Sequence, residues 1–462
     1  MGSSRRIRVA VDLTPLRVGG ENGGAKTLVT TLLREFACCC SDRFEYLLIA
    51  NASNYEELKH YQSDNMTCLT KSEIYSGLTQ SSNLPKISEP VGTYTTRRYE
   101  KIIRQPVLRL FKKTATRFTK KVTGKLLHLQ RRLLIKLKSS SSPALKSVER
   151  YVRNIQTFFQ PRILQKKHQV DLLFCPFSAP TLAEKGLPLV AIAYDLQHLD
   201  LPFFFEDIER SHRTRFLHAL NYQSTKIVCI SEFTRQSFIT NLRTPPDKLT
   251  AIPICIHERL EKQSDEYVGA VLSEQGIQRD RYLLFPANFW PHKNHRLLLA
   301  AYAIYQKRFG EQALDLVFTG ALKGSAQILE ELAKQMGLAD KVHFLGFLQE
   351  TELVAIWQGT QGLVFPSLYE GFGIPVLEAL WFSKPVACSE IGSLPEVGGD
   401  AVIYFDPRKP EEVAEAMGKI GHNPAVVSSL VAKAQSRLLH FQKQKMTAHY
   451  LSVFESAVAT RL

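Results

Sequence analysis

One stretch, residues 361–389, restricts the possible folds of this chain more than any other. Its apolar run over residues 363–365 is typical of a buried parallel strand, and Pro375 suits the first turn of a helix. The loop between them contains Gly371 and Gly373, which permit positive φ angles and a close approach of the backbone to a ligand. A second apolar run follows the helix. The stretch therefore predicts a strand, loop, helix, strand unit in a doubly wound parallel sheet.

Two carboxylates mark this predicted unit. Glu370 lies in its loop, and Glu378 lies eight positions later, in the first turns of the helix. Ligands bind at the carboxyl ends of parallel strands, where helix N-termini offer free N–H groups to phosphate. A carboxylate there accepts hydrogen bonds from the vicinal hydroxyls of a ribose or hexose. The pair predicts a sugar and phosphate site, with acids that only complement the helix dipole as the alternative.

The length of 462 residues exceeds what one hydrophobic core usually serves, so two domains are expected. Strand and helix patterns alternate in both halves, with a polar division near residue 265. We expect an α/β chain of two facing doubly wound domains, a first over 1–262 and a second over 275–430. A final helix over 431–462 could cross back to the first domain.

The net charge of +15 is concentrated in one segment. Residues 97–167 contain 21 Lys or Arg and only two acids, so the rest of the chain is not basic. Apolar residues recur there every three or four positions from 103 to 137, which predicts a basic amphipathic helix. Such a helix suits an anionic membrane surface. The alternative is that its apolar stripe packs on the first domain while the lysines are solvated. A general nucleic-acid-binding surface is not expected.

We expect no signal peptide, because the first residues lead directly into a predicted strand, and no apolar run approaches roughly 18 residues, the length that spans a bilayer. Its eight cysteines show no metal-ligand spacing, and Cys38, Cys39 and Cys40 are adjacent, which does not suit a secreted disulfide framework. We therefore expect a cytoplasmic protein with reduced thiols. The basic segment adds the option of a peripheral position on the inner face of the plasma membrane.

Two features of the first half lie at predicted strand ends. Gly19 and Gly20 begin a glycine-rich loop between a strand and a helix, which suits contact with an anion or with a ligand's phosphate. The spacing to Lys26 is similar to that of a nucleotide-hydrolase loop, except that Ala25 stands where that motif requires glycine. A plain tight turn is the third possibility. Asp195 follows another apolar strand and is expected at the same edge of the sheet.

Four motifs together resemble the retaining glycosyltransferases of family 4. They are the run from Glu370 to Glu378, the loop ending in Lys293-Asn294, the Gly19-Gly20 loop and Asp406-Pro407. The similarity is strongest over about residues 280–420, and the basic segment lies outside it. The resemblance implies the GT-B fold, in which two Rossmann-like domains enclose a cleft, here with a basic helical insertion in the first domain.

The resemblance also implies roles for residues of the second half. Glu370 would hold hydroxyls of the donor sugar, Glu378 those of the ribose, and Lys293 would neutralise the pyrophosphate leaving group. The donor site would also include Gly371, Phe372, Gly373 and Asn288. Asn288 stands where many family members have an arginine.

In the first half, the resemblance makes Asp195 a catalytic residue together with Glu370 and Lys293. Many family members have histidine before this aspartate, whereas this chain has Tyr194, and His198 is the nearest substitute. Tyrosine cannot exchange protons near neutral pH as imidazole does. The Gly19 and Gly20 loop would contact phosphate or the acceptor.

The resulting expectation is a retaining hexosyltransferase that works without a cofactor or metal ion. Its donor would be a nucleotide-diphosphate sugar, with GDP-mannose favoured, and its acceptor a glycan or lipid-linked glycan at the cytosolic membrane face. Two alternatives stay open. One is an NTP hydrolase that uses residues 20–27, and the other is a non-catalytic membrane-binding protein that acts through residues 97–167.

Overall fold

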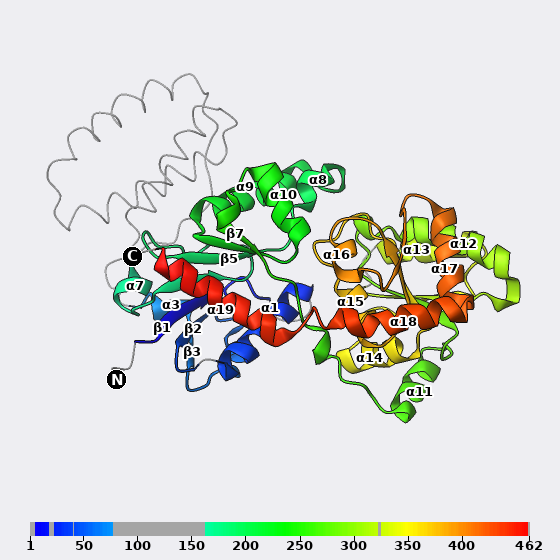
Figure 1. The fold of residues 1–462 in the computed structure, drawn as a ribbon, viewed down its shortest axis with the longest axis horizontal. Helices are drawn as coiled ribbons and strands as arrows, with labels where there is room; N and C mark the ends of the chain where they lie inside the picture. Colours follow the sequence, from blue (N-terminus) through cyan, green and yellow to red (C-terminus); the bar gives the residue numbers. More distant parts are fainter. Residues whose placement is uncertain (1–4, 18–22, 40, 77–161, 322–324, 461–462) are drawn as a thin grey trace, which may run out of the picture. The chain divides into compact units, whose positions relative to one another are not determined.

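The computed structural model describes residues 5–17, 23–39, 41–76, 162–321 and 325–460 (Figure 1). The elements discussed below belong to one compact unit, which comprises residues 1–74 and 164–462. The predicted basic helix and the loop at Gly19 and Gly20 lie outside the described residues.

The first half of the chain forms a parallel sheet of seven strands in the order β3-β2-β1-β4-β5-β6-β7. Its strands are β1 (Ile7–Asp12), β2 (Phe44–Ala50), β3 (Met66–Thr70), β4 (Leu172–Cys175), β5 (Leu189–Ala193), β6 (Lys226–Cys229) and β7 (Leu249–Ala251). Val9 on β1 aligns with Tyr46 on one side and Leu172 on the other. The strand order reverses between β1 and β4, as in a doubly wound sheet.

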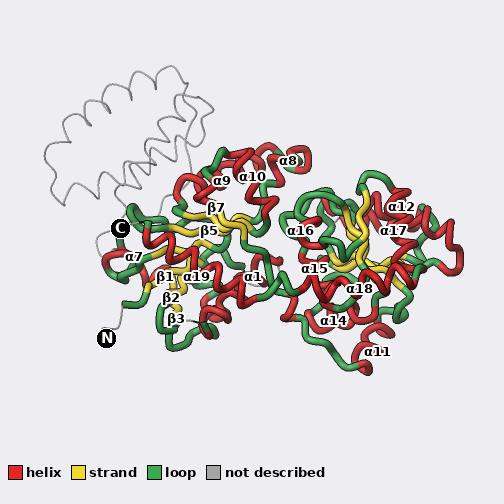
Figure 2. The backbone as a smooth tube through the Cα atoms, in the orientation of Figure 1, coloured by secondary structure: helices red, strands yellow, loops and turns green. Residues whose placement is uncertain are grey.

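Helices connect these strands and lie around the sheet (Figure 2). They are α1 (Gly23–Cys38), α2 (Tyr55–Lys59), α3 (Lys71–Ile74), α7 (Ile163–Lys166), α8 (Gln197–Asp200), α9 (Asp207–Gln223) and α10 (Glu232–Leu242). Ser231 caps α10, where its Oγ accepts a hydrogen bond of 3.0 Å from the Thr234 N–H. Such a cap satisfies one of the free N–H groups in the first turn.

The second half forms a parallel sheet of six strands in the order β10-β9-β8-β11-β12-β13. The strands are β8 (Tyr282–Pro286), β9 (Asp315–Thr319), β10 (Val342–Phe344), β11 (Gly362–Phe365), β12 (Val386–Ser389) and β13 (Ile403–Phe405). The predicted pair of doubly wound sheets is confirmed. The predicted unit of strand, loop, helix and strand is also confirmed as β11, α15 (Ile374–Trp381) and β12.

The remaining helices of the second half are α11 (Asp265–Glu274), α12 (His295–Phe309), α13 (Ser325–Gln335), α14 (Glu350–Gly359), α16 (Leu394–Gly398) and α17 (Pro410–His422). Helix α11 packs against α14. The polar division near residue 265 therefore lies at the start of a helix that belongs with the second sheet.

The C-terminal segment consists of two helices, α18 (Pro424–Leu438) and α19 (Lys443–Ala459), where the sequence predicted one. Phe441 lies between them and is buried against the Phe372 ring, at 6.0 Å between ring centres. Helix α18 packs on α15, whereas α19 packs on α1, β4 and β5 of the first half. The break in the helix places Phe441 in the core and gives α19 its own partners.

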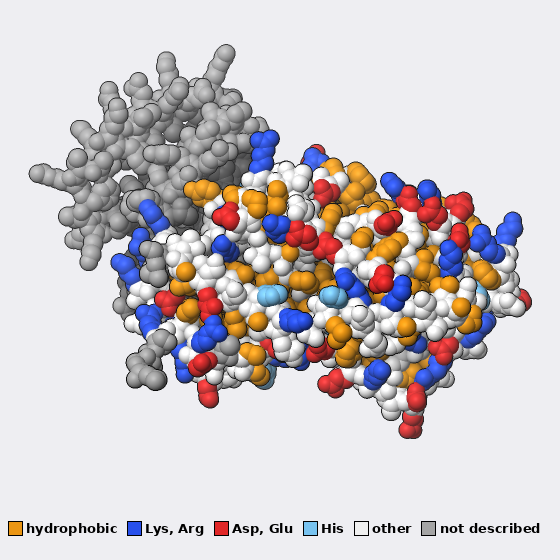
Figure 3. Space-filling model, in the orientation of Figure 1, with side chains coloured by type: hydrophobic (Ala, Val, Ile, Leu, Met, Phe, Trp, Pro, Cys, Tyr) orange, Lys and Arg blue, Asp and Glu red, His pale blue; other side chains and the backbone are white. Residues whose placement is uncertain are grey.

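Charged side chains of both signs are interspersed on the face that Figure 3 shows. Throughout the described parts of the chain, every helix is too short or too polar to cross a bilayer. Contact of residues 97–167 with a membrane surface is a different question, and it stays a prediction.

Phe454 of α19 is fully buried. The centre of its ring lies 5.0 Å from the centre of the Phe174 ring and 5.7 Å from that of the Phe36 ring. We predict that Phe454→Ala lowers the free energy of unfolding by about 3–5 kcal/mol, because it removes a core aromatic and leaves a cavity. Urea denaturation measures this loss. The exposed Ser452 of the same helix supplies the control Ser452→Ala, which should stay within about 0.5 kcal/mol of wild type. Equal free energies of unfolding for the two variants would contradict the described packing of Phe454.

Candidate active site

The candidate site lies where the strand order of the second sheet reverses, between β8 and β11. Ligands of doubly wound sheets bind at such a point, beyond the carboxyl ends of the strands. Lys293 follows β8 in the short turn η4 (Pro291–Lys293), and Glu370 follows β11. The Lys293 Nζ lies 2.5 Å from the Glu370 Oε1, and the two side chains are 16% and 11% exposed. The structure thus brings these two predicted residues into direct contact.

Asn294 fixes the loop that carries Lys293. It adopts a left-handed backbone conformation with φ of 66°, which asparagine tolerates better than most residues. Its Nδ2 donates to the carbonyl oxygens of Pro366, at 3.2 Å, and Pro407, at 2.8 Å. The Leu368 N–H donates to the carbonyl of the residue before Lys293 at 2.7 Å. These bonds join the loops after β8, β11 and β13.

The glycines of the loop after β11 are required by close contacts. Gly373 has φ of +98°, and a Cβ there would lie 2.4 Å from the Leu394 Cδ2. A Cβ on Gly371 would lie 2.3 Å from the Tyr194 carbonyl oxygen, which belongs to the first half of the chain. Only glycine fits at either place. The Phe372 side chain is buried in the core, so this residue offers its backbone rather than its ring to a ligand.

Several contacts hold this loop and α16 against the first half of the chain, and sequence reasoning missed them. Ser231 Oγ donates to the Gly371 carbonyl at 2.7 Å, and the Leu196 N–H donates to the Tyr369 hydroxyl at 3.3 Å. The Glu396 carboxylate accepts from the Glu232 N–H at 2.7 Å and from the Phe233 N–H at 2.5 Å.

Glu396 was missed because its partners are the first N–H groups of α10, more than 160 residues away in sequence. A carboxylate is a favourable partner for a helix N-terminus. Burial raises the pKa of Glu396, and the two backbone donors oppose that shift. No local pattern in the sequence could have indicated this contact.

Glu378 is buried in α15 and pairs with Arg259, whose Nη2 lies 2.8 Å from the Glu378 Oε1. This pair is separate from the pair of Lys293 and Glu370. Asn288 faces the loop after β9, because its Oδ1 accepts from the Ala321 N–H at 2.9 Å.

Asp195 follows β5 at the carboxyl edge of the first sheet. Burial raises the pKa of Asp195, whereas the Gln197 N–H, at 3.1 Å, and the charges of Arg213 and Lys293 lower it. Burial is the largest of these influences, so the pKa of Asp195 is raised overall.

The tyrosine at the predicted histidine position has a structural contact. The Tyr194 hydroxyl donates to the Pro176 carbonyl at 2.8 Å, and burial raises the pKa of Tyr194. His198 is 2% exposed, and its Nε2 has no hydrogen-bond partner among the described residues. Burial lowers the pKa of His198, so its neutral form is favoured.

The loop proposed for a nucleotide hydrolase is described only from α1 onward. Its Lys26 lies in α1, where the Nζ forms an ion pair with the Glu57 Oε1 at 2.6 Å. Gly19 and Gly20, which were expected to contact phosphate or the acceptor, lie outside the described residues.

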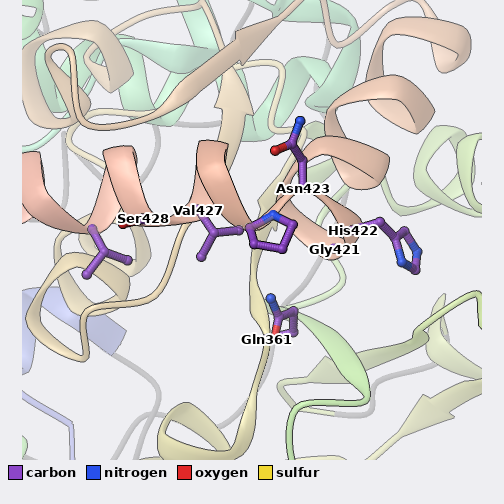
Figure 4. A pocket seen from close by; sticks show the side chains of 8 residues that line it. Gln361, Gly421, His422, Asn423, Val427 and Ser428 are labelled. Carbon is purple, nitrogen blue, oxygen red and sulfur yellow. The ribbon is translucent and has the colours of Figure 1, made fainter.

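A separate cavity of about 380 Å³ lies next to Gln361, at the amino end of β11 (Figure 4). His422, Asn423 and Val427 line it together with Gln361. It is therefore at the opposite end of β11 from Glu370. Within the described ranges, no group of three or more His, Cys, Asp or Glu side chains is arranged to hold a metal ion.

The contact at Gly371 gives a direct test of the loop geometry. We predict that Gly371→Ala lowers the free energy of unfolding by about 1–3 kcal/mol, because the new methyl group overlaps the Tyr194 carbonyl. A Cβ on Gly269 of α11 would meet no atom within 4 Å, so Gly269→Ala should raise the free energy by about 0.5–1 kcal/mol. Chemical denaturation separates the two outcomes. Stabilisation by both substitutions would contradict the described loop.

Comparison with known proteins gives a family match in the second half of the chain. Residues 273–437 match the family "Glycosyl transferases group 1". The O-antigen chain mannosyltransferase B of Escherichia coli is 26% identical over 225 residues, which cover 49% of this chain and 59% of that protein. The MMP alpha-(1->4)-mannosyltransferase of Mycolicibacterium hassiacum is 25% identical over 241 residues, 51% of this chain and 55% of that protein. The chain thus spans less than two thirds of the length of these relatives.

Solved structures share the arrangement of both sheets. HepE of Anabaena in complex with UDP and glucose has a TM-score of 0.63 at 14% identity, over 98% of this chain and 100% of that one. WaaG, a glycosyltransferase involved in lipopolysaccharide biosynthesis, has a TM-score of 0.59 at 14% identity, over 96% and 99% of the two chains. The chain therefore has the GT-B fold, and its residues 273–437 are similar to the group 1 glycosyltransferases.

Proposed function

We propose that this protein is a retaining glycosyltransferase that moves a hexose from a nucleotide-diphosphate sugar to a glycan acceptor. The observation that carries the proposal is the contact of 2.5 Å between Lys293 and Glu370. This pair is a cation beside a carboxylate at the switch point of the second sheet, inside the segment that matches the family, and it supports a site for a sugar diphosphate.

Lys293 is the proposed partner of the donor's diphosphate. Negative charge grows on the diphosphate as the bond to the sugar breaks, so a fixed ammonium group favours the transition state over the bound donor. Its Nζ also lies 5.3 Å from the centre of the Phe365 ring, which helps to fix its position. In the presence of donor, the ammonium group would lie between the diphosphate and Glu370.

The two carboxylates are proposed to recognise hydroxyl groups. Glu370 accepts from the donor hexose, and Glu378 accepts from the ribose. Asp195 is the catalytic carboxylate proposed from the first half of the chain, where it follows β5 at the carboxyl edge of the sheet. The acceptor hydroxyl would attack the anomeric carbon of the hexose on the face from which the diphosphate leaves. An oxygen of the leaving phosphate would take the proton of that hydroxyl. This course retains the anomeric configuration and uses no metal ion.

Mannose is the favoured hexose, with GDP-mannose as donor. Both curated relatives described above are mannosyltransferases, and one is named for the O-antigen chain. That name supports a glycan or lipid-linked glycan as acceptor. Residues 97–167 are proposed to hold the enzyme at an anionic membrane surface on the cytosolic side.

A panel of nucleotide-diphosphate sugars tests the proposal. One of them should bind, as measured by calorimetry, and support transfer to a glycan acceptor. Lys293→Ala should weaken that binding at least about tenfold, because it removes a charged hydrogen-bond donor, and should lower kcat further. Glu370→Gln should lower kcat/KM while the affinity for the free nucleoside diphosphate changes little.

The surface lysine of α17, Lys419, supplies the matched control. It forms an exposed pair with Glu415, so Lys419→Ala should bind and transfer as wild type does. The proposal fails if no nucleotide sugar binds, or if Lys293→Ala and Lys419→Ala bind the donor equally well.

A further inference from the structure

The segment between β7 and α11 joins the two sheets and contacts the candidate site through Arg259. This residue ends the turn η3 (His257–Arg259). Its Nη2 donates to the Glu378 Oε1 at 2.8 Å, its Nε to the Glu350 Oε2 at 3.0 Å and its Nη1 to the Ile256 carbonyl at 2.9 Å. The guanidinium group is therefore fixed by three different partners.

The two ion pairs of Arg259 differ in their surroundings. The Glu350 side chain is 57% exposed, so solvent screens that pair and its contribution is small. The Glu378 side chain is 6% exposed, and the Arg259 side chain is 17% exposed. A buried carboxylate without a partner destabilises the fold, so the pair with Glu378 contributes more to stability than the pair with Glu350 does.

The joining segment is held on α15 by a second set of contacts. The Trp381 Nε1 donates to the Leu260 carbonyl at 3.0 Å, and its ring lies 5.2 Å from the His257 ring. Trp381 is three residues after Glu378, so both project from the same side of the helix. The segment therefore contacts α15 over a full turn.

One carboxylate oxygen of Glu378 is available to accept a hydrogen bond from a ligand. Arg259 occupies Oε1, and no donor among the described residues is bonded to Oε2. A carboxylate with one oxygen fixed by arginine keeps the other oriented as an acceptor.

We infer that Arg259 is a positioning residue for nucleotide binding, because it fixes Glu378 with one oxygen directed at the ribose hydroxyls of the donor. The inference rests on the proposed function, in which Glu378 accepts from the ribose. It also means that the segment joining the two sheets takes part in donor recognition through Arg259.

Lysine cannot replace arginine in this arrangement. The guanidinium group uses three of its nitrogen atoms at once in a planar fork, whereas an ammonium group is a single point charge on a flexible stem. Lysine at this position would keep the charge but lose the fixed orientation of Glu378. The two substitutions Arg259→Met and Arg259→Lys therefore separate charge from geometry.

The test compares a nucleoside diphosphate with its 2′-deoxy form by calorimetry. Wild type should prefer the ribonucleotide by at least about tenfold, because Glu378 loses a hydroxyl partner with the deoxy form. Glu378→Ala should abolish that preference. Arg259→Met and Arg259→Lys should each reduce it to about threefold or less, with little change in the affinity for the deoxy form. Arg279 pairs with Asp265 at the surface, so Arg279→Met should keep the full preference.

The outcomes separate the inference from the function on which it rests. If wild type binds no nucleotide, or Glu378→Ala keeps the preference for ribose, the proposed donor site is wrong. If wild type and Glu378→Ala behave as expected but Arg259→Lys keeps the full preference, the positioning role of Arg259 is overturned. Thermal unfolding identifies any variant that does not fold. Arg259→Lys retains the charge beside Glu378, so it serves as the deciding variant if Arg259→Met is unfolded.

Discussion

The ion pair of Lys293 and Glu370 is the interaction around which the second half of the chain is arranged. Both side chains are largely buried, and a buried charge is stable only with its partner. The pair therefore requires the loops after β8 and β11 to stay together, and Asn294 reinforces this with bonds to the carbonyls of Pro366 and Pro407. Removal of either partner would leave a buried charge without compensation, so neither residue can be lost without cost to the loops.

The same loop depends on the first half of the chain. Gly371 lies against the Tyr194 carbonyl, where no side chain would fit, and Ser231 donates to the Gly371 carbonyl. Glu396 holds the first turn of α10. These contacts link the proposed donor site on the second sheet to the segment after β5 that contains Asp195. An enzyme that joins a donor and an acceptor needs such a link, because both must be held at one reacting centre.

The sequence predicted those features that depend on local pattern. The apolar runs and glycines around residue 371 were sufficient for β11, the loop and α15, and the carboxyl-end rule placed Lys293 and Glu370 at one edge of the sheet. The role of Tyr194 could not be predicted, because its hydroxyl is used by the Pro176 carbonyl, a non-local partner.

Two other features also depended on distant contacts. Arg259 and Glu378 are 119 residues apart, so no spacing in the sequence indicates their pairing. The C-terminal segment shows a helical pattern throughout, yet it divides at Phe441, whose ring packs on Phe372. Tertiary packing overrides local helix propensity at Phe441, whereas the pair of Arg259 and Glu378 is a non-local contact that leaves no local pattern. Residues 97–161 of the basic segment, the clearest feature of composition, lie outside the described residues, and the membrane contact stays a prediction.

The most direct test of the account is a crystal structure of the chain with a bound nucleotide-diphosphate sugar. The account predicts the diphosphate within hydrogen-bond distance of the Lys293 Nζ, with the hexose hydroxyls on Glu370 and the ribose on Glu378. A nucleotide bound instead in the cavity beside Gln361 and His422, with Lys293 and Glu370 still paired and no ligand between them, would contradict it.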